Sequence, residues 1–183
     1  MKFCSNCGKA VLKEVPPGDN RPRYVCKFCP MIHYQNPRII VGVLPCKDDR
    51  VLLCKRDIEP GFGKWTLPSG FMEMGESLEE GAKREALEEA NLKIRIKNLY
   101  GTYSIPKIGQ VLFIYIGKIS NNDFRAADET SEVSLTRINN IPWNQIAFPS
   151  VEFFLRKYVI DYKNGMSFSF HSNYLTENSE TVL

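Results

Sequence analysis

Apolar residues recur along the chain in short runs of the strand type rather than in long helical stripes. Residues 38–47 and 51–55 are rich in β-branched and apolar side chains, and the polar turn Asp48-Asp49-Arg50 joins them. This arrangement predicts a β-hairpin. The same criteria predict further strands at residues 65–67, 93–103, 111–118 and 132–135.

Two segments carry the start and stop signals of helices. Residues 78–90 follow Ser77, and Glu80 stands three residues after this serine, which is the pattern of a capping box. A second helix is predicted over residues 150–163, with Ser150 as its N-cap and Gly165 as its stop. Strands outnumber the two helices, so the pattern predicts an α+β fold.

Polar segments separate these elements and end the chain. Residues 34–37, with the sequence Tyr-Gln-Asn-Pro, predict a linker between an N-terminal appendage and the main domain. Residues 121–131 predict a loop, and residues 142–146 predict a turn or a brief helix. The last ten residues, from Asn173, are polar and predict a loose end.

Four of the six cysteines form two C-x2-C pairs, Cys4 with Cys7 and Cys26 with Cys29, separated by eighteen residues. Each pair can hold a metal from a tight turn, and this spacing is typical of a Cys4 zinc site. Gly8 suits the turn after the first pair because the chain needs a positive φ there. Four thiolates with no open position predict structural zinc. Iron in a rubredoxin-like site and unbound thiols are the alternatives.

About 35 residues cannot build a core alone, so metal binding would have to supply the folding free energy of this segment. Structural zinc typically contributes about 10–16 kcal/mol. The other two cysteines, Cys46 and Cys54, lie in or beside apolar strand candidates, and we expect them to be buried as small hydrophobic residues.

Composition narrows the class of protein without defining its function. The chain has 183 residues, of which 43% are hydrophobic and 25% charged, which is typical of a globular protein and excludes wholesale disorder. Its longest apolar runs are far short of the roughly 20 residues of a membrane helix, and its start has no signal-peptide pattern. We therefore expect a soluble, cytoplasmic protein. The net charge of +3 hides two concentrations, because residues 1–38 hold 7 basic and 2 acidic residues whereas residues 70–92 hold 2 and 7.

The acidic concentration falls on the first predicted helix. At 100° per residue, Glu85, Glu88 and Glu89 lie within an arc of about 100° on one face. Three carboxylates so close together repel one another unless a cation lies among them, and Mg²⁺ and Mn²⁺ prefer such oxygen ligands. A solvated acidic face is the alternative. Arg84 can reach two carboxylates four residues away, those of Glu80 and Glu88. Small residues beside the acidic face let the helix approach a sheet closely, and they are Ala82, Ala86 and Ala90.

The helix and the loop before it resemble the Nudix box, G-x5-E-x7-R-E-U-x-E-E-x-G-U, in which U is a bulky aliphatic residue. Two positions depart from it: Ala86 is smaller than the usual aliphatic residue, and Asn91 replaces the glycine that ends the helix in a left-handed conformation. Asparagine is the next best residue for that conformation. The match covers 23 residues, and the fitting positions are Gly70, Glu76, Arg84, Glu85, Glu88, Glu89 and Leu92.

The resemblance implies an α/β/α sandwich with a mixed sheet over residues 37–165, after a zinc ribbon at 1–36 and before a C-terminal tail at 166–183. It implies hydrolysis of a nucleoside diphosphate linked to another moiety, with Mg²⁺ or Mn²⁺ as catalytic metal. The metal ligands would be Glu85, Glu88 and Glu89, supported by the Gly70 carbonyl, while Glu76 and Arg84 would brace the helix. The remaining candidates are Glu132 as a further catalytic acid with Glu129 second, and Tyr103, Tyr100, Phe71 and Glu73 as substrate contacts.

The likeness extends to a ribbon-bearing Nudix group that acts on ADP-ribose and FAD, and the residues that carry it are 33–38, 69–73 and 148–150. A second ribbon-bearing group cleaves NADH and carries a Ser-Gln-Pro-Trp-Pro-Phe-Pro signature. That signature is absent here, where residues 103–110 read Tyr-Ser-Ile-Pro-Lys-Ile-Gly-Gln. ADP-ribose or FAD is therefore the expected substrate, and NADH or an RNA cap or end is the alternative.

The alternative of another class is a regulator that senses nucleotides or binds nucleic acid through its basic ribbon, where Phe3, Tyr24 and Phe28 interleave with the basic residues. A regulator would be expected to have lost box carboxylates, and none is lost. Zinc and four thiolates would also lower the charge of residues 1–38 from +5 to about +3. We therefore expect a nucleotide-hydrolysing homodimer that binds neither membrane nor nucleic acid.

Overall fold

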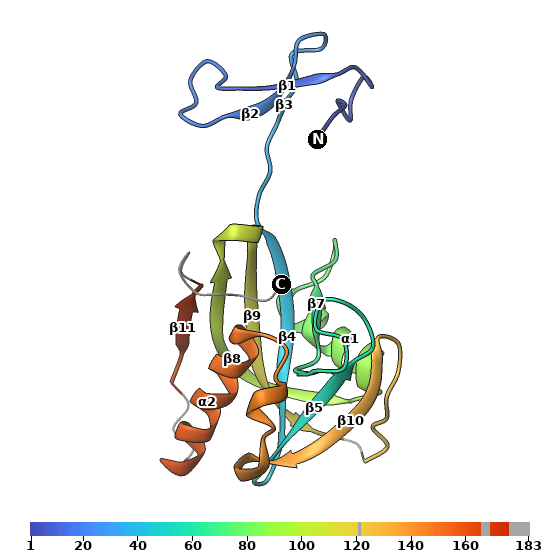
Figure 1. Ribbon diagram of the computed structural model, residues 1–183, viewed down its shortest axis with the longest axis vertical. Coiled ribbons are helices and arrows are strands. Elements are labelled where there is room, and N and C mark those ends of the chain that lie inside the picture. Colours follow the sequence, from blue (N-terminus) through green and yellow to red (C-terminus); the bar gives the residue numbers. More distant parts are fainter. Residues whose placement is uncertain (121, 166–168, 176–183) are drawn as a thin grey trace. The chain divides into compact units, whose positions relative to one another are not determined.

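The computed structural model describes residues 1–120, 122–165 and 169–175. The chain forms two compact units, Met1–Pro37 and Arg38–Leu183, which are described separately below (Figure 1).

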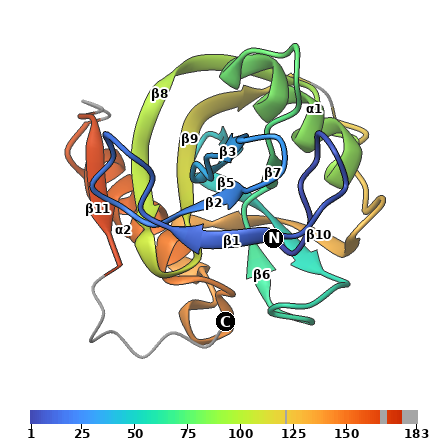
Figure 2. The ribbon, with the colours of Figure 1, turned by 90° about the horizontal axis from the view of Figure 1, so that it is seen from above.

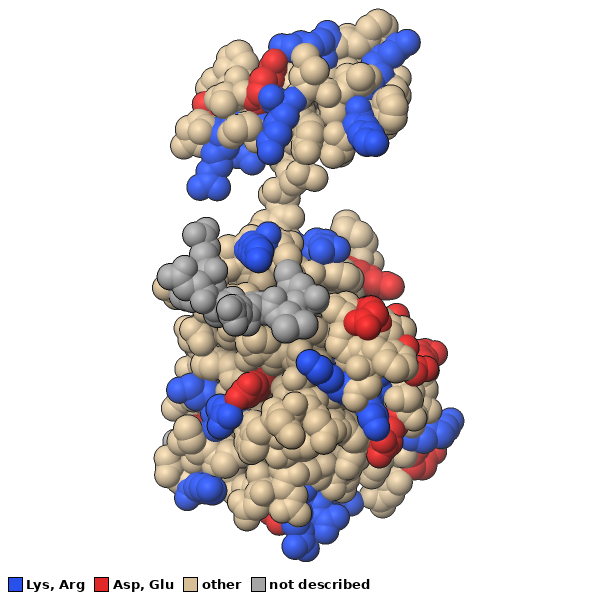
Figure 3. Space-filling model, in the orientation of Figure 1, with Lys and Arg blue, Asp and Glu red and all other residues tan. Residues whose placement is uncertain are grey.

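The first unit is a small three-stranded ribbon. Its antiparallel strands are β1 (Val11–Glu14), β2 (Arg23–Cys26) and β3 (Ile32–His33), in the order β1-β2-β3. Gly8 has the predicted positive φ, of 72°. Lys and Arg side chains are spread over the visible face of this unit, and acidic side chains are few there (Figure 3). Apart from a proline, its buried apolar side chains are Cys4, Val25 and Cys26.

The second unit is built on a mixed sheet of eight strands. Its main path runs in the order β10-β5-β4-β9-β8-β11, with β6 paired to β5 and β7 paired to β4. The pairs β4–β9 and β8–β11 are parallel, and the other pairs are antiparallel. The strands are β4 (Arg38–Lys47), β5 (Arg50–Arg56), β6 (Trp65–Thr66), β7 (Ser69–Phe71), β8 (Ile94–Ile105), β9 (Gln110–Ile119), β10 (Thr130–Arg137) and β11 (His171–Tyr174).

Two helices cover opposite faces of this sheet (Figures 1 and 2). Because side chains alternate along a strand, β4 directs Val41 and Val43 toward α1 (Leu78–Ala90) and Leu44 toward α2 (Pro149–Lys163). The predicted alanine stripe of α1 is fully buried against the sheet. Cys46 and Cys54 are buried, one on each face, as expected. The predicted α/β/α sandwich is confirmed.

The first helix matches its prediction at both ends. The Ser77 side chain accepts a hydrogen bond from the Glu80 backbone N–H, and the Glu80 side chain accepts from the Ser77 backbone N–H. Asn91 ends the helix in the left-handed conformation, with φ 48° and ψ 36°, and its N–H donates to the carbonyls of Ala86 and Leu87. Asparagine therefore serves here in place of the glycine of the box.

The second helix corrects its predicted start. It begins at Pro149, with Phe148 as an N-cap that makes no side-chain capping bond, and Ser150 lies inside the first turn, 3% exposed. Proline pre-sets φ for the first helical position, so the helix starts one residue early. The described residues of this unit also form three short 3-10 helices: η1 (Pro106–Ile108), η2 (Ile138–Asn140) and η3 (Trp143–Gln145). The last lies within the predicted turn or brief helix at 142–146.

Strand pairing extends the sheet beyond the prediction. β10 covers eight residues rather than four, and β7 was not predicted. The expected loose end from Asn173 is wrong for its described part, because Asn173 and Tyr174 pair with Tyr103 and Ser104 of β8. Residues 176–183 lie outside the described residues. Among the described residues, no helix is both long and apolar enough to span a membrane.

Candidate active site

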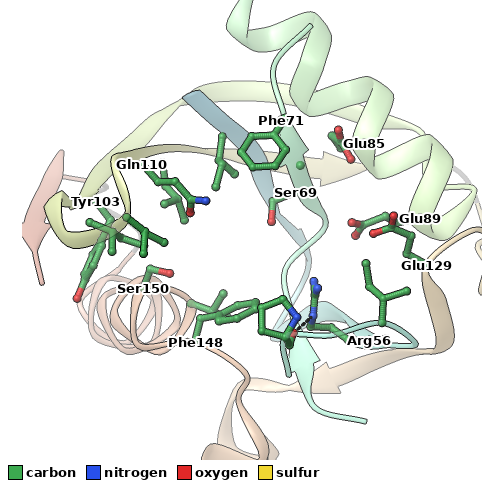
Figure 4. Close-up of a pocket in the computed structure, with 18 of the residues that line it drawn as sticks. Arg56, Ser69, Phe71, Glu85, Glu89, Tyr103, Gln110, Glu129, Phe148 and Ser150 are labelled. Atoms are coloured by element: carbon green, nitrogen blue, oxygen red, sulfur yellow. Dashed lines mark hydrogen bonds between the residues drawn. The ribbon is translucent and has the colours of Figure 1, made fainter. Parts of the chain in front are cut away.

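A cleft of about 700 Å³ opens in the second unit between α1 and the first turn of α2. Its floor is formed by β4, β7 and β9, and the segments after β5 and before β10 close it on one side (Figure 4). Of the predicted site residues, those that line it are Gly70, Phe71, Glu73, Arg84, Glu85, Glu88, Glu89 and Tyr103.

Arg84 organises the carboxylates on this side of the cleft. Its guanidinium donates to both carboxylate oxygens of Glu76, from Nε at 3.0 Å and from Nη2 at 2.9 Å. Nη1 donates to Glu85 Oε1 at 2.8 Å and to Glu88 Oε2 at 3.0 Å. The hydrogen bonds to Arg84 lower the pKa of Glu76 and raise that of the arginine. Arg84 thus connects Glu76, in the loop before α1, to Glu85 and Glu88 of the helix, and its bracing role stays a prediction.

The sequence also left Glu80 within reach of Arg84, and the structure corrects this expectation. The Glu80 carboxylate instead accepts from the backbone N–H of Ser77 at 2.8 Å and from its hydroxyl at 2.7 Å. The helix cap therefore uses Glu80, and Arg84 bonds instead to Glu76 and to two carboxylates that line the cleft, Glu85 and Glu88.

The three box carboxylates differ in burial. Glu85 and Glu89 are 9% and 7% exposed, whereas the side chain of Glu88 is 47% exposed. Burial, with a smaller contribution from the charge of Glu85, raises the pKa of Glu89 to about 8. Burial also raises the pKa of Glu85, against the hydrogen bond from Arg84. Both shifts arise chiefly because burial removes the water that stabilises an ionised carboxylate.

Glu89 and Gly70 provide a test of whether a divalent cation fits here. Glu89 Oε2 is buried and has no hydrogen-bond partner among the residues that the structure describes. Gly70 lies so close to Glu85 that a Cβ on it would collide with the Glu85 carboxylate, so only glycine brings the backbone this near. Buried carboxylate oxygens are the donors that Mg²⁺ and Mn²⁺ prefer. The donor set therefore fits the predicted catalytic metal.

The further acid expected at Glu132 is not brought to the cleft. Glu132 lies on β10 opposite Lys55 of β5, and its half-exposed carboxylate, 55% accessible, accepts from Lys55 Nζ at 3.2 Å. Glu129, the second choice, lines the cleft with Asp128 and lies beside Glu89 in Figure 4. The loop that carries it is tied to the end of α1 by the Ala127 N–H, which donates to the Glu89 carbonyl at 3.1 Å.

Of the predicted substrate contacts, some also lie at the cleft and one lies away from it. Tyr103 and Phe71 line the cleft, and Phe71 is 46% exposed with the Arg38 guanidinium 4.6 Å from its ring centroid. Glu73 lies at the rim, where its N–H donates to Glu76 Oε1 at 2.7 Å. Tyr100 is a core residue instead, since it is fully buried and its hydroxyl donates to Asp161 Oδ2 at 2.8 Å.

Several cleft residues carry no local signal by which the sequence could have identified them. Arg56 is the last residue of β5 and lies on the same side of the cleft as Glu89 in Figure 4. Its Nε donates to the Pro60 carbonyl at 2.7 Å, and its guanidinium is 5.1 Å from the Phe148 ring centroid. Gln110 and Ser150 reach the cleft from β9 and α2. Only the assembled sheet brings these residues together.

The ribbon gathers its four cysteines into one cluster. All four sulfur atoms lie within 4.8 Å of one another, with Cys4 Sγ 3.6 Å from Cys29 Sγ and Cys7 Sγ 3.5 Å from Cys26 Sγ. A tetrahedron of sulfurs about 2.3 Å from a zinc ion has edges of this length. His33 Nε2 lies 3.2 Å from Cys4 Sγ, which suits a neighbour that orients a ligand. The cluster therefore fits the predicted metal.

The sandwich fold and the carboxylate-bearing helix beside the cleft define a protein of the α/β/α class with a candidate metal-binding active site. Comparison with known families makes the assignment specific, because the NUDIX domain model matches residues 36–158 and the Nudix N-terminal zinc-ribbon model matches residues 2–35. The chain belongs to the Nudix family and is a Nudix hydrolase.

Individual relatives agree with this assignment. The chain is 35% identical to an ADP-ribose pyrophosphatase from Methanocaldococcus jannaschii, over 72% of this chain and 78% of that protein. It is 29% identical to an NAD-capped RNA hydrolase NudC from Photorhabdus laumondii, over 68% of this chain but only 46% of that protein. A crystal structure of a Nudix hydrolase from Nitrosomonas europaea is 47% identical and superposes with a TM-score of 0.92, covering 96% of this chain and 99% of that chain.

Proposed function

We propose that the chain hydrolyses the pyrophosphate bond of a nucleoside diphosphate linked to another moiety, with ADP-ribose or FAD as substrate. The observation that carries this proposal is the set of buried carboxylates, with one unpaired oxygen on Glu89, that faces a cleft large enough for a dinucleotide-like ligand. The relative from Methanocaldococcus jannaschii, which the chain covers over most of its length, bears the name of an ADP-ribose pyrophosphatase.

The chain's own residues have distinct tasks in this reaction. Glu85, Glu88 and Glu89, with the Gly70 carbonyl, would hold the divalent ion, which when bound neutralises phosphate charge and lowers the pKa of water. Arg84 fixes two of these carboxylates, so their positions are set before any ligand arrives. The tight packing of Gly70 against Glu85 holds the loop beside them.

Two residues outside the box complete the proposed machinery. Glu129 takes the role first expected for Glu132: its carboxylate lies beside Glu89 on the cleft and can accept a proton from the attacking water. Arg56 is held by the Pro60 carbonyl and stacks near Phe148, and none of the ion pairs within 4.0 Å among the described residues involves it. Its remaining N–H groups can therefore bind a phosphate oxygen.

A substrate panel tests this function. Zinc-loaded protein would be assayed with Mg²⁺ or Mn²⁺ on ADP-ribose, FAD, NADH, diadenosine polyphosphates and capped RNA, and kcat/KM would be compared. We expect ADP-ribose or FAD to lead by about tenfold or more, which corresponds to about 1.4 kcal/mol of differential transition-state binding. Preference for another member of the panel, or no hydrolysis of any, would contradict the proposal.

NADH or NAD-capped RNA is the second candidate substrate. It is favoured by the name of the NudC relatives, one of which is 29% identical over 68% of this chain. It ranks second because this chain spans less than half of that relative, and because residues 103–110 lack the signature of the NADH-cleaving group. The same panel separates the two candidates.

We also propose that the ribbon holds one structural zinc ion, supported by the four clustered sulfur atoms. Homodimer formation is proposed from the family resemblance, a cytoplasmic location from the composition of the chain, and the lack of nucleic-acid binding from the intact box and the modest charge of a zinc-loaded ribbon. Elemental analysis tests the zinc content directly, and size-exclusion chromatography with light scattering tests the homodimer.

A further inference from the structure

The cleft has two halves of different chemistry (Figure 4). The half beside α1 contains carboxylates and the guanidinium groups of Arg84 and Arg56. The other half lies between β8, β9 and the start of α2, and its apolar walls are Tyr103, Ile105, Ile108, Leu112, Val151 and Leu175.

Two uncharged polar side chains project into this apolar half. Ser150, only 3% exposed, turns its hydroxyl toward the open space, and the Gln110 amide points into the same space from β9 (Figure 4). Neither side chain is hydrogen-bonded to another residue in the part of the chain that the structure describes. A polar group in a largely apolar site is energetically unfavourable unless it forms a hydrogen bond with a partner. These two groups therefore point to a ligand that supplies hydrogen-bond partners.

The start of α2 adds donors at the same place. Phe148 is its N-cap and makes no side-chain capping bond, and the helix runs for 15 residues. The first N–H groups of a helix have no partner within it, so they can donate to acceptor atoms of a ligand. Ser150 stands in this first turn, and its hydroxyl and the helix N-terminus therefore face one ligand.

The wall on the far side is closed by the C-terminal strand. The Leu175 N–H donates to the Ser104 carbonyl at 2.9 Å, and its side chain packs against the core cluster while lining the cleft. Asp161 of α2 fixes β11 through His171, whose Nε2 lies 2.9 Å from Asp161 Oδ2. The pocket is thus enclosed by elements that are themselves anchored.

We propose, on the basis of the proposed function, that this neutral half is the nucleobase site, in which the Gln110 amide and the Ser150 hydroxyl bind the polar edge of the base. A flat, uncharged heterocycle matches apolar walls with a few hydrogen-bonding groups. A phosphate group would need cations, and the cations that line the cleft lie in its other half. Specificity for the base and cleavage of the pyrophosphate are therefore assigned to separate halves.

Binding of the two products of ADP-ribose cleavage tests the proposal. AMP carries the base, and ribose 5-phosphate lacks it. With full-length, zinc-loaded protein, we expect Gln110→Leu and Ser150→Ala each to raise the calorimetric Kd of AMP by about tenfold and to leave that of ribose 5-phosphate unchanged. The matched control is Gln145→Leu, an exposed glutamine of η3 that does not line the cleft.

Base preference supplies a readout that a general packing defect would not move. If Gln110 recognises the edge of the base, the ratio of AMP to inosine 5′-monophosphate affinity should shrink in Gln110→Leu and stay at its wild-type value in Gln145→Leu. The proposal is overturned if AMP binding is unchanged in both cleft variants. It is equally overturned if ribose 5-phosphate binding weakens instead, because the pocket would then hold a sugar.

The two proposals fail in distinguishable ways. If wild-type protein cleaves none of the diphosphates but AMP binding depends on Gln110, the base site stands and the proposed function falls. If Gln110→Leu and Ser150→Ala both cleave ADP-ribose with wild-type KM, the function stands and the base site falls.

Discussion

The ribbon and the larger unit are held together by different means. The larger unit packs two clusters of buried side chains on the two faces of one sheet, whereas Met1–Pro37 buries few apolar side chains, two of which are the cysteines Cys4 and Cys26. Burial of apolar surface stabilises the first kind of unit. The ribbon has too little of it, so its fold depends on the metal that its sulfurs can hold.

The two candidate metal sites also differ in how far protein contacts hold their ligands in place. In the ribbon, four sulfurs converge on one another, and His33 Nε2 lies 3.2 Å from one of them. On α1, two of the three box carboxylates are already held by Arg84, and the helix is capped and packed through its alanine stripe. We therefore propose that a metal is part of the structure at one site and takes part in the reaction at the other.

The largest expected effect concerns the reaction. Glu88→Gln keeps the size of a half-exposed side chain whose one ion pair among the described residues is with Arg84, so the fold should survive. Removing one carboxylate from the proposed metal site should lower kcat by about a hundredfold or more. The control is Glu79→Gln on the same helix, whose partner Lys83 lies 3.9 Å away on the solvated side. Near-normal turnover in Glu88→Gln would contradict the assignment of Glu88 as a metal ligand.

Zinc removal should affect the ribbon without unfolding the larger unit. After chelation, four thiols should react with a disulfide reagent while the protein remains folded, and six should react only in denaturant. Cys46 and Cys54 are protected because burial raises their pKa and excludes the reagent. Limited proteolysis should cut within residues 1–37 first. Retention of a protease-resistant ribbon after complete loss of zinc would contradict this difference between the units.

The acid outside the box gives a smaller, paired test. Glu129→Gln should lower kcat by about tenfold to a thousandfold, as expected for the loss of a group that accepts a proton. Glu132→Gln removes only an exposed pair with Lys55 and should change kcat by less than about twofold. The reverse ranking would return the role to Glu132.

The smallest effect expected is on stability, at the end of α1. Asn91→Ala should lower the free energy of unfolding by about 1–2 kcal/mol, because alanine is strained in the left-handed conformation. Asn91→Gly relieves that strain but loses the hydrogen bond from Asn91 Nδ2 to the Asp123 carbonyl at 3.0 Å. In this variant the gain and the loss should nearly cancel, so the free energy of unfolding should change little. Denaturant unfolding measures both variants. Equal losses would show that the helix end does not depend on backbone conformation.

Local signals explain why the catalytic helix could be predicted from the sequence. Ser77, Glu80 and Asn91 each act within a few residues of the helix end that they stabilise. The start of α2 was misplaced by one residue because Ser150 imitates an N-cap while Pro149 sets the first turn. Both outcomes depend on contacts between near neighbours in the chain.

Long-range pairing explains what the sequence did not reveal. β11 exists because His171 pairs with Gly101, 70 residues earlier, and no pattern within the last residues indicates this partner. The register of β10 against β5 decides that Glu132 meets Lys55, while Glu129 remains before the strand. Likewise, Gln110 and Ser150 become neighbours across a cleft only when the strands and α2 assemble.

Binding of Mn²⁺ to zinc-loaded protein, followed by electron paramagnetic resonance at pH 8.5, tests the central claim most directly. This pH lies above the pKa of about 8 of Glu89, so its carboxylate is ionised and available. The account predicts that Glu85→Gln and Glu89→Gln each weaken Mn²⁺ binding by about tenfold or more while the zinc content remains one per chain. Mn²⁺ binding that is unchanged in both variants would contradict it.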